Sequence, residues 1–142
     1  MSASDYLENA LLKLLFNGTA IANIADNAGT APKTVLNWAL HQSDPGDAGT
    51  QATNEASYTG YARVAVARDS TGHTVTGSSM SPTNNVNFPQ STGGSNTATH
   101  FDIGVGASGA SNILVSGTVS PNIVITSTVT PVLVPATAVT CD

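Results

Sequence analysis

The strongest constraint on the fold is a series of short alternating segments that runs from Thr34 to the C-terminus. Turn signals rich in glycine, proline, asparagine and serine separate these segments roughly every 8 to 12 residues, as in sandwiches and barrels. Valine, isoleucine and threonine are most frequent after Asn112, which suits β-strands. We therefore expect about seven to nine strands in an all-β domain, a β-sandwich of jelly-roll type over residues 34–142.

The first of these segments contains the only tryptophan of the chain. Leu36, Trp38 and Leu40 alternate with smaller or more polar residues, which predicts that their face belongs to the core. A second strand is expected from Tyr58 to Arg68, where small residues alternate with tyrosine, valine and arginine. An acidic, turn-rich loop joins the two strands.

Another segment, residues 97–105, also alternates well. Its odd-numbered residues from Phe101 on are expected to point inward, whereas His100 and Asp102 should point outward. The G-x-G-x-x-G pattern that follows, residues 104–109, would need a helix to hold a dinucleotide. Because a β-type run follows instead, we interpret it as a hairpin turn.

The N-terminal 17 residues differ from the rest, since they predict an amphipathic helix from Ser4 to Asn17. Leucines 7, 11, 14 and 15 form one helical stripe. This stripe either covers one end of the β-core or docks on a neighbouring subunit. Residues 18–33 form a polar connector between the helix and the β-domain.

Charge excludes several classes of function. Charged residues make up 9% of the chain, against about 25% in average soluble domains. Four basic residues and a net charge of −5 argue against nucleic acid and against an anionic membrane surface. No apolar run is long enough for a transmembrane helix, and the acidic N-terminus does not resemble a secretory signal. The single cysteine, Cys141, excludes an internal disulfide and a cysteine-only metal site.

No motif in the chain predicts catalysis or a cofactor. The three histidines lie on three separate segments, and no nucleophile elbow is present. Asp44, Asp47 and Glu55 lack the spacing of a calcium loop. A solvated turn in which Asp44 bonds the backbone explains them better, although a weak cation site between subunits is an alternative. We therefore expect a protein that is not an enzyme.

The segment from Tyr58 to Arg68 allows two interpretations. Tyrosine and arginine are typical of protein contacts, but the tyrosines could equally cover the core while the arginines pair with acids. A symmetric dimer formed through an edge strand is also plausible. The candidate subunit contacts are Leu7, Leu11, Leu14, Asp44, Asp47, Tyr58, Tyr61 and Arg63.

Several motifs, in this order, resemble small virion structural proteins of tailed phages and prophages. They are residues 1–12 (MSASDYLENALL), 39–49 (ALHQSDPGDAG), 61–63 (YAR), 86–89 (VNFP) and 99–103 (THFDI). Members of this group are described as tail-fibre-like or simply as virion structural proteins. Small β-sandwich proteins of this size also act as cement or decoration proteins on phage heads.

The resemblance implies a component of the virion that assembles in the bacterial host cytoplasm. Our main expectation is a cement protein that binds the outside of the head, stabilises capsid subunit contacts and has the major capsid protein as its partner. It is expected to be a homo-oligomer, a dimer or a trimer. The first alternative is a tail-associated or tail-fibre protein, and the second is a carbohydrate- or host-binding module.

Overall fold

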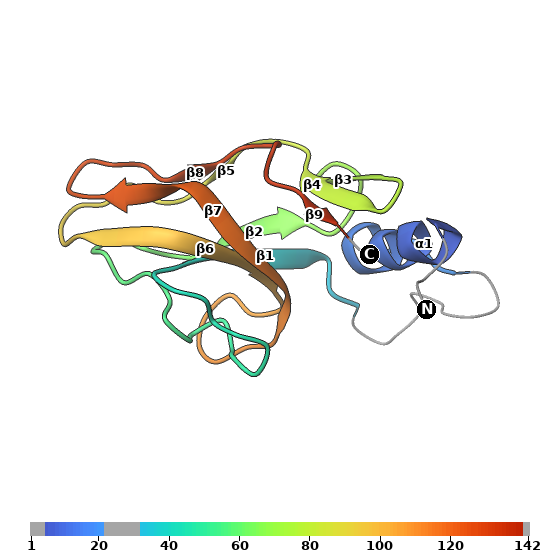
Figure 1. The fold of residues 1–142 in the computed structure, drawn as a ribbon, viewed down its shortest axis with the longest axis horizontal. Coiled ribbons are helices and arrows are strands. Elements are labelled where there is room, and N and C mark those ends of the chain that lie inside the picture. The colour runs from blue at the N-terminus through green and yellow to red at the C-terminus, as the bar shows by residue number, and fades with distance from the viewer. Residues whose placement is uncertain (1–4, 22–31, 141–142) are drawn as a thin grey trace. The chain divides into compact units, whose positions relative to one another are not determined.

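The computed structural model describes residues 5–21 and 32–140. They form one helix and nine strands (Figure 1). Five strand pairs are antiparallel, namely β1–β6, β3–β4, β4–β9, β5–β8 and β6–β7. The all-β prediction with a short N-terminal helix is therefore confirmed. The elements are α1 (Asp5–Asn17), β1 (Val35–His41), β2 (Val64–Ala67), β3 (His73–Thr76), β4 (Ser79–Pro82), β5 (Val86–Asn87), β6 (Asn96–Gly104), β7 (Ile113–Ile125), β8 (Val132–Leu133) and β9 (Val139–Thr140).

The strands form three sheets, with the orders β2-β1-β6-β7, β3-β4-β9 and β5-β8. The chain divides into two compact units. The first comprises residues 1–35, 66–85 and 134–142, and the second comprises residues 36–65 and 86–133. The chain passes between the units several times, and β2 lies at one of these passages.

The core of the second unit forms where β1 pairs with β6. Trp38 lies opposite Ile103 and Leu40 opposite Phe101 in the antiparallel register, and all four side chains are buried. The rings of Trp38 and Phe101 stack with their centroids 5.5 Å apart. The predicted core face of the first strand is thus buried, because it contacts the inward face of β6.

The other face of β1 is buried as well, including Asn37, Ala39 and His41. Simple alternation predicts that one face of a strand is exposed to solvent, but the buried Gln51 side chain, from the following loop, lies against β1 and donates to the carbonyl of Asn37. A strand covered on both faces loses the alternating burial pattern.

The second predicted strand is shorter than expected. β2 begins at Val64, whereas residues 58–63 contain a turn at Gly60 and belong to no strand. Gly60 has a φ of 96°, and the N–H of Tyr61 donates to the carbonyl of Tyr58 at 3.0 Å. The positive φ of Gly60 bends the chain out of the extended conformation, so the prediction of a strand from Tyr58 was wrong for its first half.

In the first unit, α1 packs against β3 and β4. The helix buries Leu12 and Phe16, and the Phe16 ring lies 5.4 Å from the imidazole of His73. Leu7 and Leu15, from the predicted stripe, keep 41% and 36% of their surface exposed. The helix is apolar on two adjacent faces, and β3 and β4 cover the one that periodicity did not single out.

Candidate functional site

The acidic loop does not gather its carboxylates. Asp44 is exposed, and its Oδ1 accepts a hydrogen bond from the N–H of Gly46 at 2.8 Å, as in the predicted turn. Asp47 is also exposed, whereas Glu55 turns toward Arg63. Over residues 5–21 and 32–140, no group of three or more histidine, cysteine or acidic side chains could hold a metal ion.

Arg63 ties the acidic loop to the glycine-rich turn. Its Nε and Nη2 donate to the two carboxylate oxygens of Glu55 at 2.7 and 2.8 Å, a bidentate pair. Nη1 and Nη2 also donate to the carbonyls of Gly106 and Gly109 at 3.0 and 2.8 Å. The hydrogen bond to Glu55 raises the pKa of Arg63. Arg63 therefore holds two loops that are distant in the sequence.

The two tyrosines near Arg63 are also engaged inside the second unit. The Tyr58 hydroxyl donates to the carbonyl of Pro89 at 2.8 Å, and burial raises the pKa of Tyr58 to about 12. The Tyr61 hydroxyl donates to Glu55 at 2.9 Å and accepts from the N–H of Leu40 at 3.1 Å. These contacts fit the interpretation in which tyrosines cover the core and arginine pairs with an acid, and a contact of this segment with another subunit stays a prediction.

A buried polar network lies beside this cluster, and it joins His41, Gln51 and Asp102. His41 Nε2 lies 2.7 Å from Asp102 Oδ2, and His41 Nδ1 lies 2.8 Å from the carbonyl of Thr53. Gln51 Nε2 donates to Asp102 Oδ1 at 2.7 Å and to the carbonyl of Asn37 at 3.0 Å. All three network side chains are fully buried.

The network has the residue types of a catalytic dyad but not the geometry. Both ring nitrogens of His41 already have partners, so neither is available to activate a nucleophile. The Gln51 amide oxygen accepts from the N–H of Gly106 at 3.0 Å, which anchors the glycine-rich turn as well. The arrangement can fix two loops against the sheet, and it leaves no acid or base facing solvent.

Sequence reasoning missed this network because it predicted that Asp102 faces solvent. Phe101 and Ile103 do point into the core, and Asp102 correctly occupies the opposite face of β6. That face is covered, since Gln51 packs onto it. A local signal exists: a charged residue sits between two large apolar residues on a strand that ends in glycine. Gly104 leaves the space, because a Cβ there would lie 2.2 Å from Gln51 Cδ.

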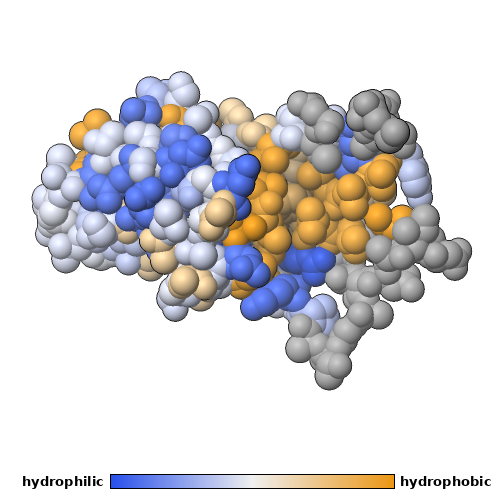
Figure 2. All heavy atoms as spheres, turned by 60° about the horizontal axis from the view of Figure 1, so that its bottom comes forward, coloured by the Kyte–Doolittle hydropathy of each residue, from blue (hydrophilic) through white to orange (hydrophobic). Residues whose placement is uncertain are grey.

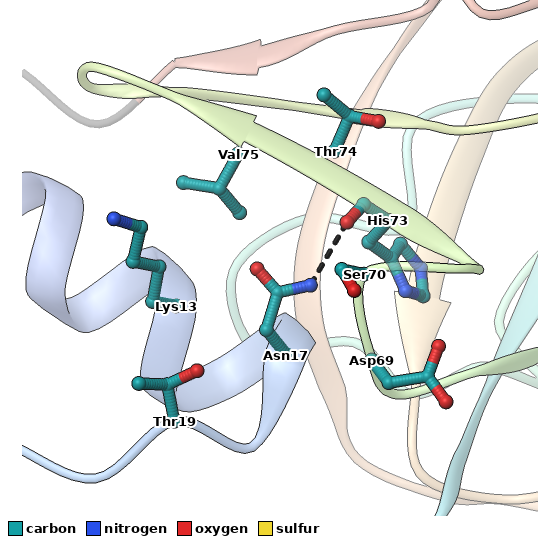
Figure 3. A pocket seen from close by; sticks show the side chains of 8 residues that line it. All are labelled: Lys13, Asn17, Thr19, Asp69, Ser70, His73, Thr74 and Val75. Carbon is teal, nitrogen blue, oxygen red and sulfur yellow. Dashed lines mark hydrogen bonds between the residues drawn. The ribbon is translucent and has the colours of Figure 1, made fainter.

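A second candidate site is a pocket of about 440 Å³ in the first unit (Figure 3). The Asn17 side chain donates to the carbonyl of His73 at 2.8 Å across it. Burial lowers the pKa of His73, and its Nδ1 lies 2.9 Å from the carbonyl of Ala67. The lining residues are Lys13, Asn17, Thr19, Asp69, Ser70, His73, Thr74 and Val75.

The two charged side chains of the pocket do not form a catalytic pair. Figure 3 shows Lys13 and Asp69 at opposite sides of the pocket. Asp69 Oδ1 accepts from the hydroxyl and the N–H of Thr71 at 2.6 and 2.8 Å, and these bonds lower the pKa of Asp69. The carboxylate thus stabilises the turn before β3. The pocket has room for a small polar molecule, and its chemistry selects no particular one.

The leucines predicted as contacts remain at least partly accessible. Hydrophobic residues gather over α1 in Figure 2. Leu7 is exposed, and Leu11 and Leu14 are half-buried. Within the described residues, no helix has the length and hydropathy needed to cross a bilayer.

One comparison with known proteins is informative. A family model described as "Podophage GP4 fiber I protein gp80" matches residues 2–141 of the chain. Among curated proteins, none matches the chain significantly.

Proposed function

Since the chain belongs to the family of podophage GP4 fiber I protein gp80, a family of phage virion structural proteins of fibre type, we propose that it is a tail-associated or tail-fibre component. The observation that carries this proposal is the extent of the match, which covers nearly the whole chain. Its role in the virion is mechanical: it holds a defined shape and contacts neighbouring subunits.

The family match favours the first alternative from the sequence over the main expectation. A cement protein on the head, with the major capsid protein as its partner, has no support from the match. The broader prediction of a phage virion structural protein is the part that the match confirms. We therefore place the proposed contacts of the chain in the tail or fibre.

The polar groups of the second unit support a non-enzymatic role. The buried network forms its hydrogen bonds within itself and with the main chain, through His41, Asp102 and Gln51. Glu55 is held by Arg63 and Tyr61. Groups fixed in this way stiffen loops and have no free position for substrate. Rigid loops suit a protein that transmits force.

A carbohydrate-binding role receives less support than the fibre role. Such modules present an exposed aromatic platform to the sugar. Trp38, Phe88 and Phe101 are buried, and Tyr58 is 3% exposed. Tyr6 on α1 is the aromatic residue with a large exposed fraction, 71%, and one exposed ring does not make a platform.

The contacts proposed for assembly are those that the fold leaves accessible. Asp44 and Asp47 lie on the exposed part of the acidic loop, and the leucines at 7, 11 and 14 lie on α1. Tyr58, Tyr61 and Arg63 act inside the second unit and shape the loop that carries the two aspartates.

Copy number in purified particles tests the proposed location. Quantitative mass spectrometry should find roughly six to eighteen copies per virion, as we expect for a component arranged around the axis of a tail. Immunogold labelling should place the protein on tails and leave heads unlabelled. Hundreds of copies, or gold particles on heads alone, would contradict the proposal and would favour the expectation of a cement protein on the head. Tail-less heads from the same preparation serve as the control.

A further inference from the structure

The largest sheet ends in an unusually long strand with one open edge. β7 (Ile113–Ile125) is the last strand of the order β2-β1-β6-β7, and it pairs with β6 on one side (Figure 1). Within the described residues, no strand pairs with its other side, and the loop residue Thr50 forms a bridge with Asn112 directly before β7. Every second N–H and C=O group along that side therefore points away from the sheet. Such a row of groups is a template for another strand.

The first half of this edge lacks charge and proline, two of the features that normally prevent pairing, although its register with β6 shifts between Ile113 and Val115. Proteins protect edge strands with charged side chains or proline. From Ile103 to Cys141 the chain contains no aspartate, glutamate, lysine or arginine. Pro121 removes one donor, but it follows the run from Ile113 to Ser120 and leaves that run intact.

The side chains of this run are compatible with a neighbouring strand. Ser116, Thr118 and Ser120 are exposed, small and able to hydrogen-bond, and they alternate along one face. Gly117 lies between them near the middle of the run, and a Cβ at this position would lie 2.8 Å from the Phe101 ring. The glycine is therefore required by the packing inside the sheet, and it leaves the backbone uncovered.

We propose that the Ile113–Ser120 half of β7 pairs with the same segment of a second copy of the chain, in an antiparallel arrangement around a two-fold axis. Across such an axis the central residue faces its own copy and the other residues face members of the same run, so a run with charges of one sign would repel itself. This run is neutral. The pairing would extend the sheet continuously from one copy into the next, and it would give the protein a two-fold contact besides its attachment to the virion.

Introducing opposite charges on β7 tests both parts of the proposal, that the partner is a second copy of the chain and that β7 forms the contact. One variant carries Ser116→Lys, Thr118→Lys and Ser120→Lys, and a second carries glutamate at the same three positions. Because the three side chains lie on one face of β7, at least one of them lies opposite a substituted residue of the second copy when the two-fold axis is near the centre of the run. Sedimentation velocity and native mass spectrometry of the purified chain give the oligomeric state. Circular dichroism and thermal unfolding show whether each variant is folded.

A matched control places the same charge elsewhere. Ser57→Lys, Ser95→Lys and Ser127→Lys lie at exposed positions outside β7. We expect the wild type and this control to be dimers. The lysine and glutamate variants should each dimerise with a dissociation constant at least about tenfold higher, since like charges oppose one another across the pair. An equimolar mixture of the two variants should form a mixed dimer.

Three outcomes would overturn the proposal. The first is a wild type of another oligomeric state. The second is a lysine variant that dimerises as tightly as the wild type. The third is a mixture of folded lysine and glutamate variants that stays monomeric. Restoration in the mixture also excludes misfolding as the cause of dissociation, because unfolded chains would not be rescued by the opposite charge.

Discussion

At the scale of single residues, the buried hydrogen bond between Asp102 and His41 should contribute strongly to the stability of the fold. Both side chains have 0% exposed surface. Removing the carboxylate leaves His41 Nε2 and the Gln51 amide buried with one hydrogen-bond partner fewer, which typically costs about 1–3 kcal/mol for each group. Asp102→Ala should therefore lower the free energy of unfolding by roughly 2–6 kcal/mol in urea titrations. Asp47→Ala, at an exposed position, is the matched control and should change it by less than about 0.5 kcal/mol.

A second residue-scale prediction concerns the space at Gly104. A methyl group there would meet the buried Gln51 side chain at 2.2 Å, so one of them must shift. Overpacking of this kind typically costs about 1–3 kcal/mol, and Gly104→Ala should lower the free energy of unfolding accordingly.

The control for this prediction is Gly93→Ala, because a Cβ at Gly93 meets its nearest neighbour at an ordinary 3.5 Å. In a double-mutant cycle, Gly104→Ala should cost less in a Gln51→Ala background, where the clash is absent. Equal costs in both backgrounds would mean that Gln51 is not what requires the glycine.

At the scale of elements, substitutions on the two apolar faces of α1 should show which face stabilises the first unit. Phe16 is fully buried against His73, so Phe16→Ala should lower the free energy of unfolding by about 3–5 kcal/mol. Leu7→Ala changes a side chain that is 41% exposed and should cost much less. Denaturant titration of both variants measures the difference. A larger loss of stability for Leu7→Ala would mean that the predicted leucine stripe is the face of α1 that packs in the core.

The contact between α1 and β3 should also depend on pH through His73. Burial lowers the pKa of His73 below its ordinary value of 6.5. As the pH falls through that value, the unfolded chain takes up a proton that the folded chain resists, so stability decreases. The loss begins near the unfolded pKa and levels off below the folded one.

His73→Gln isolates this effect from the other two histidines. The difference in unfolding free energy between the wild type and the variant should shift against the wild type when urea titrations move from pH 8 to pH 5. Asp69 and Lys13 lie in the same pocket, and Asp69 favours the protonated imidazole, which partly offsets the burial. A difference that is constant over this range would show that His73 binds protons equally in both states.

These elements also show what the sequence could and could not predict. Local periodicity located the helix to within one residue, and it located β1 and β6 nearly as well. The choice between the two faces of α1 depends on β3 and β4, which lie more than 50 residues away in the sequence. The burial of Asp102 depends likewise on Gln51, which approaches from a loop that has no periodic pattern of its own.

At the scale of the whole molecule, the shortage of charge should determine how copies associate. The chain has a net charge of −5, yet the proposed β7 contact contains no charged residue. Salt weakens contacts made by ion pairs and leaves neutral hydrogen bonds and apolar contacts nearly unchanged. The dissociation constant of the dimer should therefore change less than about threefold between roughly 50 and 500 mM sodium chloride.

Analytical ultracentrifugation at several salt concentrations measures this constant. The mixed dimer of the lysine and glutamate variants is the positive control, because its contact is ionic and should weaken as salt rises. Net repulsion between two acidic copies can only make the wild-type dimer tighter at high salt, since screening reduces it. A wild-type dimer that weakens tenfold over the same range would mean that ion pairs hold the copies together, and the contact would then have to lie outside β7.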